Sequence, residues 1–111
     1  MNLSKKHNIR TISRKDEIRQ ILENGKKIYT KYGPIFLYFS NEVKIKKAAV
    51  LIKKKIGSAV KRNYIKRIFK NLIINYLKNS KSFNRIVFIF NVNDKIGYKE
   101  LYVELKSLNK Y

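Results

Sequence analysis

The 111-residue sequence contains no cysteine, one proline, one histidine and only seven acidic residues. The lack of cysteine excludes disulfide bonds and thiolate metal sites. No apolar run approaches the roughly 20 residues that a membrane-spanning helix needs. The basic segment 1–10 is not followed by the apolar stretch of a signal peptide. These absences predict a soluble cytoplasmic protein with no membrane partner.

Residues that could carry catalysis are equally scarce. His7 lies near the N-terminus, where we expect it to be solvated. Asp16 and Glu17 fall in the first turn of an expected helix, where acids complement the helix dipole. Glu100 and Glu104 are four residues apart, the spacing of surface helix partners. Because the chain also has no Gly-rich phosphate loop and no nucleophile elbow, we assign it no catalytic residue and no metal ligand.

Positive charge, in contrast, is abundant. Lys and Arg number 27, and the formal net charge is +20. Between residues 43 and 93 there is no Asp or Glu, whereas Lys and Arg occur fourteen times. A stretch of one sign repels itself, and a phosphate backbone is the natural polyanion to neutralise it. The alternative is a solvated surface made Lys-rich by codon usage, which does not account for the missing acids.

The hydrophobic fraction of 44% indicates a folded chain, and its length indicates one domain spanning residues 1–111. Residues 1–10 are expected to form a flexible basic segment. Ser13 is the expected cap of the first helix, Gly25 its end, and residues 41–47 a hairpin loop. Helices are expected at residues 14–24, 59–77 and 98–108, and strands at residues 35–39, 48–52 and 86–90. The order α-β-β-α-β-α predicts an α+β sandwich of helices on a small mixed sheet.

The helix expected at residues 59–77 combines an apolar side with a basic one. Arg62, Lys66 and Lys70 recur every four residues and form a row of roughly 12 Å, with Asn63 and Arg67 beside it. The apolar side is expected to contain Val60, Ile65, Ile68, Phe69, Leu72, Ile73, Tyr76 and Leu77. Spacing alone predicts a helix that binds nucleic acid; a solvated helix face is the alternative.

The approach to this helix adds further basic residues. Lys53, Lys54 and Lys55 lead into it, and the backbone amides near Gly57 and Ser58 offer an anion site at its N-terminus. Residues 53–67 read K-K-K-I-G-S-A-V-K-R-N-Y-I-K-R. This stretch resembles the signature of the protein subunit of bacterial ribonuclease P (RNase P). The residues in register with that signature are Lys54, Lys55, Gly57, Ala59, Val60, Arg62, Asn63, Lys66 and Arg67.

The resemblance extends over nearly the whole chain and implies a ribosomal-protein-like fold with a left-handed β-α-β crossover. It implies that the partner RNA subunit, not this chain, holds the catalytic centre. That RNA uses magnesium, held mainly by the RNA itself, to remove the 5′ leader of precursor tRNA by hydrolysis. The protein of such an enzyme binds the RNA subunit through its signature and holds the single-stranded leader in a cleft.

The resemblance also assigns roles to individual positions. Residues expected to bind the RNA subunit are Lys53, Lys54, Lys55, Arg62, Asn63, Lys66, Arg67 and Lys70. Residues expected to line the leader cleft are Ile18, Leu22, Tyr38 and Tyr64. Three departures stand out. Tyr64 replaces an arginine of the signature, Ser58 replaces an asparagine, and Ile18 and Leu22 occupy positions that are commonly phenylalanine.

Two other functions also fit the sequence. The same fold could belong to a ribosomal or rRNA-binding protein, which is structural and processes nothing. The chain could also be a cationic surface binder without a defined RNA partner. The signature favours RNase P, because a generic ribosomal protein does not need Arg-Asn-x-x-Lys-Arg after Gly-x-Ala-Val.

Overall fold

The protein is described by a computed structural model for residues 9–42, 45–53, 57–79, 82–91 and 98–106. The elements are β1 (Ile9–Thr11), α1 (Lys15–Asn24), β2 (Lys26–Thr30), β3 (Gly33–Tyr38), β4 (Lys46–Ile52), α2 (Ala59–Asn79), β5 (Arg85–Phe90) and α3 (Tyr98–Lys106). The three predicted helices and three predicted strands are all present. The strands β1 and β2 were not predicted. None of the helices described is long and apolar enough to cross a membrane.

The five strands form one mixed sheet in the order β1-β4-β5-β3-β2. β1, β4 and β5 are parallel, and β3 is antiparallel to both β5 and β2. The prediction of a hairpin loop at residues 41–47 is wrong, because β5 lies between β3 and β4 and because Lys46 and Lys47 belong to β4. β4 and β5 are adjacent and parallel, so the chain must cross over one face of the sheet to connect them, and α2 forms this crossover.

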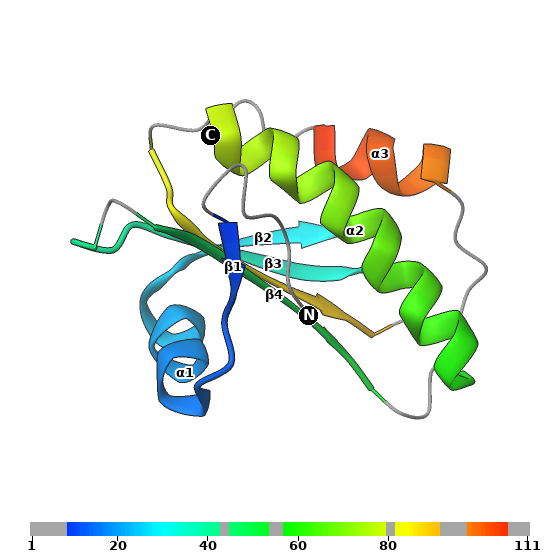
Figure 1. The fold of residues 1–111 in the computed structure, drawn as a ribbon, viewed down its shortest axis with the longest axis horizontal. Helices are drawn as coiled ribbons and strands as arrows, with labels where there is room; N and C mark the ends of the chain where they lie inside the picture. Colours follow the sequence, from blue (N-terminus) through cyan, green and yellow to red (C-terminus); the bar gives the residue numbers. More distant parts are fainter. Residues whose placement is uncertain (1–8, 43–44, 54–56, 80–81, 92–97, 107–111) are drawn as a thin grey trace.

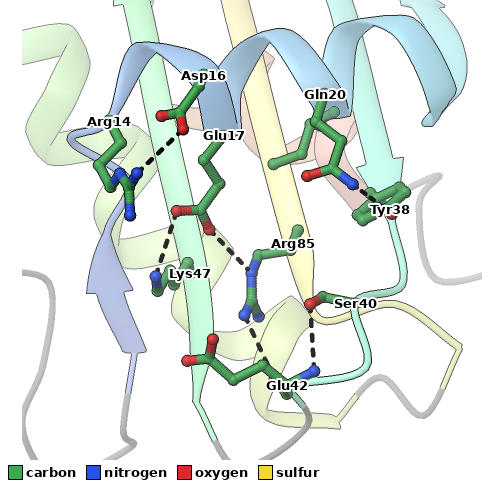
Figure 2. A pocket seen from close by; sticks show the side chains of 10 residues that line it. Arg14, Asp16, Glu17, Gln20, Tyr38, Ser40, Glu42, Lys47 and Arg85 are labelled. Atoms are coloured by element: carbon green, nitrogen blue, oxygen red, sulfur yellow. Dashed lines mark hydrogen bonds and ion pairs between the residues drawn. The ribbon is translucent and has the colours of Figure 1, made fainter.

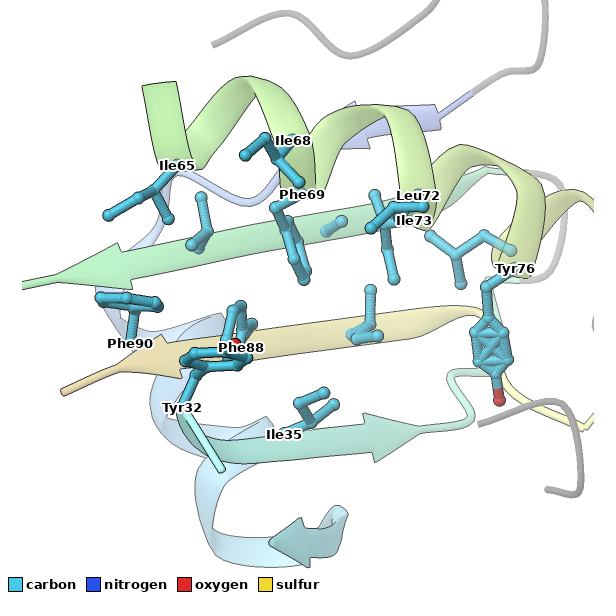
Figure 3. Close-up of a cluster of buried hydrophobic side chains, with 14 of the residues drawn as sticks. Tyr32, Ile35, Ile65, Ile68, Phe69, Leu72, Ile73, Tyr76, Phe88 and Phe90 are labelled. Carbon is cyan, nitrogen blue, oxygen red and sulfur yellow. The ribbon is translucent and has the colours of Figure 1, made fainter. Parts of the chain in front are cut away.

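One face of the sheet is covered by α2, and Figure 3 shows the cluster of side chains between them. Phe69 of α2 stacks on Phe88 of β5 with ring centroids 5.1 Å apart. Val60, predicted to join this apolar side, is instead 80% exposed. It lies about 140° around the helix axis from Ile65, on the side that faces away from the sheet.

The opposite face of the sheet is covered in part by α1, so the two helices lie on opposite sides (Figure 1). The core on this side contains Ile12, Ile21, Phe36, Ala49 and Val87. Along β4 the side chains alternate, with Val50 packed on the α2 side and Ala49 on the α1 side. The strand β4 is therefore covered on both faces. The third helix, α3, packs against α2.

The ends of α1 differ in how well they were predicted. Ser13 is not its cap; Arg14 occupies that position, and its side chain makes no capping hydrogen bond. Gly25 does end the helix, and its N–H donates to the Ile21 carbonyl at 2.8 Å. A Cβ atom at Gly25 would lie 2.5 Å from that carbonyl oxygen and 3.0 Å from the Leu37 oxygen. Only glycine therefore allows this close turn into β2.

The N-terminal boundary of the fold also differs from the prediction. Ile9 and Arg10, assigned to a flexible segment, form β1 and pair with Lys46 and Lys47 of β4. Ile9 is fully buried in the α2-side core. Residues 1–8, the rest of the predicted flexible segment, lie outside the described residues.

Candidate RNA-binding surfaces

The basic row of α2 (Arg62, Lys66 and Lys70) runs along one flank of the helix. All three side chains are half-buried, whereas Asn63 and Arg67 next to the row are exposed. Lys66 lines a pocket together with Val50, Leu51, Ile52, Lys53 and Ile89. The flank therefore borders β4 and β5. The structure thus brings Lys53 and Lys66 together.

At the start of α2, part of the predicted anion site is already occupied by internal hydrogen bonds. The Ser58 hydroxyl accepts a hydrogen bond from the Lys61 N–H at 3.2 Å, and an Nη1 donor of Arg62 bonds to the Gly57 carbonyl at 2.7 Å. Arg62 thus has a structural role beside any role in RNA binding. Lys54 and Lys55, also predicted to bind RNA, lie outside the described residues.

Three of the four residues predicted for the leader cleft lie on the α1 side of the sheet. Ile18 and Leu22 of α1 and Tyr38 of β3 pack half-buried at the edge of that core, with Leu51 and Ile89. We call these five residues the α1-side margin. The amide of Gln20 also donates to the Tyr38 hydroxyl at 3.3 Å, which ties α1 to β3.

Tyr64, the fourth predicted cleft residue, is not brought to this margin. It belongs to α2, which covers the other face of the sheet, and it is 47% exposed. It follows Arg62 by two positions, so it points to the opposite side of the helix from the basic row. The resemblance placed Tyr64 in the leader cleft, but its position on α2 separates it from Ile18, Leu22 and Tyr38.

Beside Tyr38, a pocket of about 290 Å³ lies between α1 and the adjacent ends of the strands (Figure 2). Three of the seven acids of the chain line it. Its lining residues are Arg14, Asp16, Glu17, Gln20, Ile21, Tyr38, Ser40, Glu42, Lys47 and Arg85. Acids are so few in this chain that their gathering here indicates a structural function.

That function centres on Arg85, whose side chain is only 2% exposed. Its Nε lies 3.4 Å from one carboxylate oxygen of Glu17, and Lys47 Nζ lies 3.3 Å from the other. The remaining guanidinium donors reach the carbonyl oxygens of Ile45, Asn84 and Glu42 at 2.6, 2.9 and 3.3 Å. These partners offset the cost of taking the Arg85 charge out of water. Glu17 therefore fastens α1 to β4 and β5.

This network was not predicted, because Glu17 was assigned only to the helix dipole. The sequence nevertheless contains a feature that indicates a partner for Arg85. Arg85 begins an otherwise apolar strand in a segment without acids, and a buried arginine requires an anionic or carbonyl partner from elsewhere in the chain.

The acids around the pocket do not fit a magnesium site. Magnesium is bound through carboxylate and water oxygens in near-octahedral geometry. Here Glu17 is paired with Lys47 and Arg85, and Asp16 is paired with Arg14 at 3.1 Å. Within the described part of the chain, no three His, Cys, Asp or Glu side chains are placed to share an ion.

Replacing Glu17 by alanine is expected to lower the free energy of unfolding by about 1–3 kcal/mol, because the nearly buried Arg85 loses its anionic partner. Asp16→Ala is the matched control. Its ion pair is about three-quarters exposed on both sides, so it should change stability by less than about 1 kcal/mol. Urea denaturation of both variants measures the difference. Equal midpoints for the two variants would show that Glu17 does not fasten α1.

Comparisons with known proteins agree with this fold. A family model described as ribonuclease P matches residues 4–111. The RNase P protein component of Clostridioides difficile is 27% identical over 101 residues, which cover 89% of this chain and 88% of that protein.

Two solved structures share the fold, which confirms the predicted α+β class. The RNase P protein of Staphylococcus aureus has a TM-score of 0.76 at 19% identity, over 90% of this chain and 92% of that one. The protein from Thermotoga maritima has a TM-score of 0.73 at 18% identity, over 90% and 94%.

Proposed function

This chain belongs to the family of RNase P proteins, which are ribonuclease components of tRNA processing, and from this we propose that it binds the catalytic RNA subunit and the 5′ leader of precursor tRNA. The observation that carries the proposal is the basic row of α2. Its three cations share one flank of the helix, within a segment from residue 43 to residue 93 that contains no acid. A phosphate backbone neutralises such a row.

We assign the RNA subunit to this flank and to the residues around it. The residues in that role are Lys53, Lys54, Lys55, Arg62, Asn63, Lys66, Arg67 and Lys70. Arg67 and Asn63 are exposed and accessible to RNA. An asparagine can donate to and accept from base or sugar edges, which a lysine cannot.

We propose that the leader binds to the α1-side margin. Lys66 supports this assignment, because the pocket that it lines also contains Leu51 and Ile89 of the margin. A single RNA strand could therefore contact the basic row and then continue onto the apolar margin. Tyr38 is the aromatic ring of the margin available for base stacking, whereas Ile18 and Leu22 offer shape alone. Tyr64 of α2 lies on the other face of the sheet and is not part of this site.

We propose that the catalytic centre lies in the RNA subunit. We propose that magnesium is held mainly by the RNA subunit and that it promotes hydrolysis of the phosphodiester between leader and mature tRNA. The protein raises affinity for the precursor and lowers the repulsion between the two RNAs with its net charge of +20. We further propose a cytoplasmic location, because precursor tRNA is the substrate that we assign.

Binding to a bacterial RNase P RNA is expected to weaken steeply with salt. Each neutralised phosphate contributes roughly −0.7 to −0.9 to the slope of log K against log salt concentration. If at least four of the assigned cations contact phosphates, the slope is about −3 or steeper. Fluorescence anisotropy of labelled RNA at several salt concentrations measures it. A slope near −1 would mean that the row mostly faces solvent.

A double variant separates the row from charge in general. Lys66→Gln with Lys70→Gln should weaken binding and make the slope shallower by about 1.5, since two phosphate contacts are lost. Lys99→Gln with Lys106→Gln on α3 removes the same charge from two exposed positions outside the row and should leave the slope nearly unchanged. Equal losses from both pairs would contradict a specific surface on α2. Arg62 is left intact because it also bonds to Gly57.

A further inference from the structure

Strand β2 carries an aromatic side chain that the fold does not use. Tyr29 is 78% exposed, compared with 50% for Phe39, 47% for Tyr64 and 43% for Tyr102. Lys27, two residues earlier on the strand, places its Nζ 4.8 Å from the centroid of the Tyr29 ring and 5.8 Å from that of Phe36. Core packing cannot explain a ring that is this exposed.

The pairing register shows which face of the sheet carries this ring. Lys27 is opposite Phe36, and Tyr29 is opposite Pro34. Side chains directly opposite each other on antiparallel strands share a face, and Phe36 belongs to the core under α1. Tyr29 and Lys27 therefore lie on the same side of the sheet as the α1-side margin, at the edge strand that α1 does not contact closely (Figure 1).

The charge around Tyr29 fits an anionic partner. Lys27 is exposed beside the ring, and β2 contains no acid. An exposed ring with a cation beside it is the arrangement by which proteins hold single-stranded nucleic acid, since the ring stacks on a base while the cation attracts the backbone. Sequence-tolerant stacking of this kind suits a leader whose sequence varies between precursors.

We propose that Tyr29 and Lys27 form a stacking position for one unpaired base of the leader, at the sheet edge beside the α1-side margin. The inference rests on the proposed function of the chain. Along β3, Pro34 is four residues from Tyr38, roughly 13 Å at the usual rise of a strand. Because Ile35 is opposite Phe88, Pro34 and Tyr29 lie level with Ile89, which is opposite Leu51. The position is therefore at the edge of the sheet, level with the two margin residues that share a pocket with Lys66. It supplies an aromatic ring on the side where Ile18 and Leu22 supply none.

The test compares two substrates of the reconstituted holoenzyme, a precursor tRNA with a long leader and the same tRNA without a leader. Tyr29→Ala should weaken binding of the long-leader substrate about 5- to 150-fold, the range that corresponds to roughly 1–3 kcal/mol per stacked base. Binding of the leaderless tRNA should not change. Tyr29→Phe keeps the ring and should bind normally.

Tyr102→Ala is the matched control. Tyr102 is also an exposed tyrosine with a lysine near its ring, 43% exposed and 6.0 Å from Lys106 Nζ, but it lies on α3. Its replacement should leave both substrates unaffected. Unchanged long-leader binding by Tyr29→Ala, or an equal loss on the leaderless tRNA, would overturn the inference.

A spectroscopic readout is independent of the holoenzyme. The chain has no tryptophan, so Tyr29→Trp introduces a single indole at the proposed position. Single-stranded RNA added to the full-length variant should quench or shift the emission of this indole by stacking. Tyr102→Trp should not respond. Oligonucleotide binding seen by anisotropy, without any change in the indole emission of the Tyr29→Trp variant, would contradict the inference.

The outcomes also separate this inference from the proposed function. If wild-type holoenzyme prefers the long-leader substrate and Tyr29→Ala keeps that preference in full, only the stacking position is wrong. If the wild-type protein neither binds RNase P RNA nor favours a leader, the proposed function itself is wrong.

Discussion

Replacing Phe69 by alanine is expected to lower the free energy of unfolding by about 3–5 kcal/mol, the usual cost of truncating a buried phenylalanine. Phe69 is fully buried in the core under α2 and stacks on Phe88. The loss is a large share of the roughly 5–15 kcal/mol that stabilises an ordinary domain. Because α2 also carries the basic row, RNA binding should fall with the fraction of folded protein. Urea denaturation followed by circular dichroism measures the change.

Val60→Ala is the matched control on the same helix. A buried valine would cost more than about 1 kcal/mol on truncation, but Val60 is 80% exposed. We therefore expect its replacement to change stability by less than about 0.5 kcal/mol. A loss at Val60 comparable to that at Phe69 would show that the first turn of α2 is packed differently from the description above.

The parts of the fold that could be predicted are those with strong hydrophobic patterns. α2, β4 and β5 have long apolar stretches or clear helical spacing, and all three are present near their predicted bounds. β2 was missed because Lys26–Thr30 is a short, mostly exposed strand at the edge of the sheet, where no core demands apolar residues. β1 was missed because three residues are too few for a pattern.

The topology was harder to predict than the elements. β3 and β4 follow one another in sequence, which favours pairing as neighbours, and this led to the wrong hairpin. The sheet instead inserts β5 between them, so that the longest helix crosses one face and returns to the next strand. Local sequence does not record which later strand will take a place between two earlier ones.

The candidate site was predictable to the extent that it depends on one helix. The spacing of Arg62, Lys66 and Lys70 placed them on one flank of α2 without a structure. The pairing of Glu17 with Arg85 could not be read in the same way, because it joins residues distant in sequence. Tyr64 shows that a resemblance also has limits. It predicted Tyr64 for the leader cleft, but the position of a residue around its helix determines which surface it belongs to.

The most direct test of the account is 5′ leader release by a bacterial RNase P RNA at low magnesium and moderate salt, with and without this protein. We expect strong stimulation when the protein is added to the RNA, because its charge supports association of the two RNAs where little magnesium is present. The protein alone, treated with nuclease to remove RNA and then purified from the nuclease, should release no leader. Leader release by the protein alone at a comparable rate, or no stimulation of the RNA, would contradict the account.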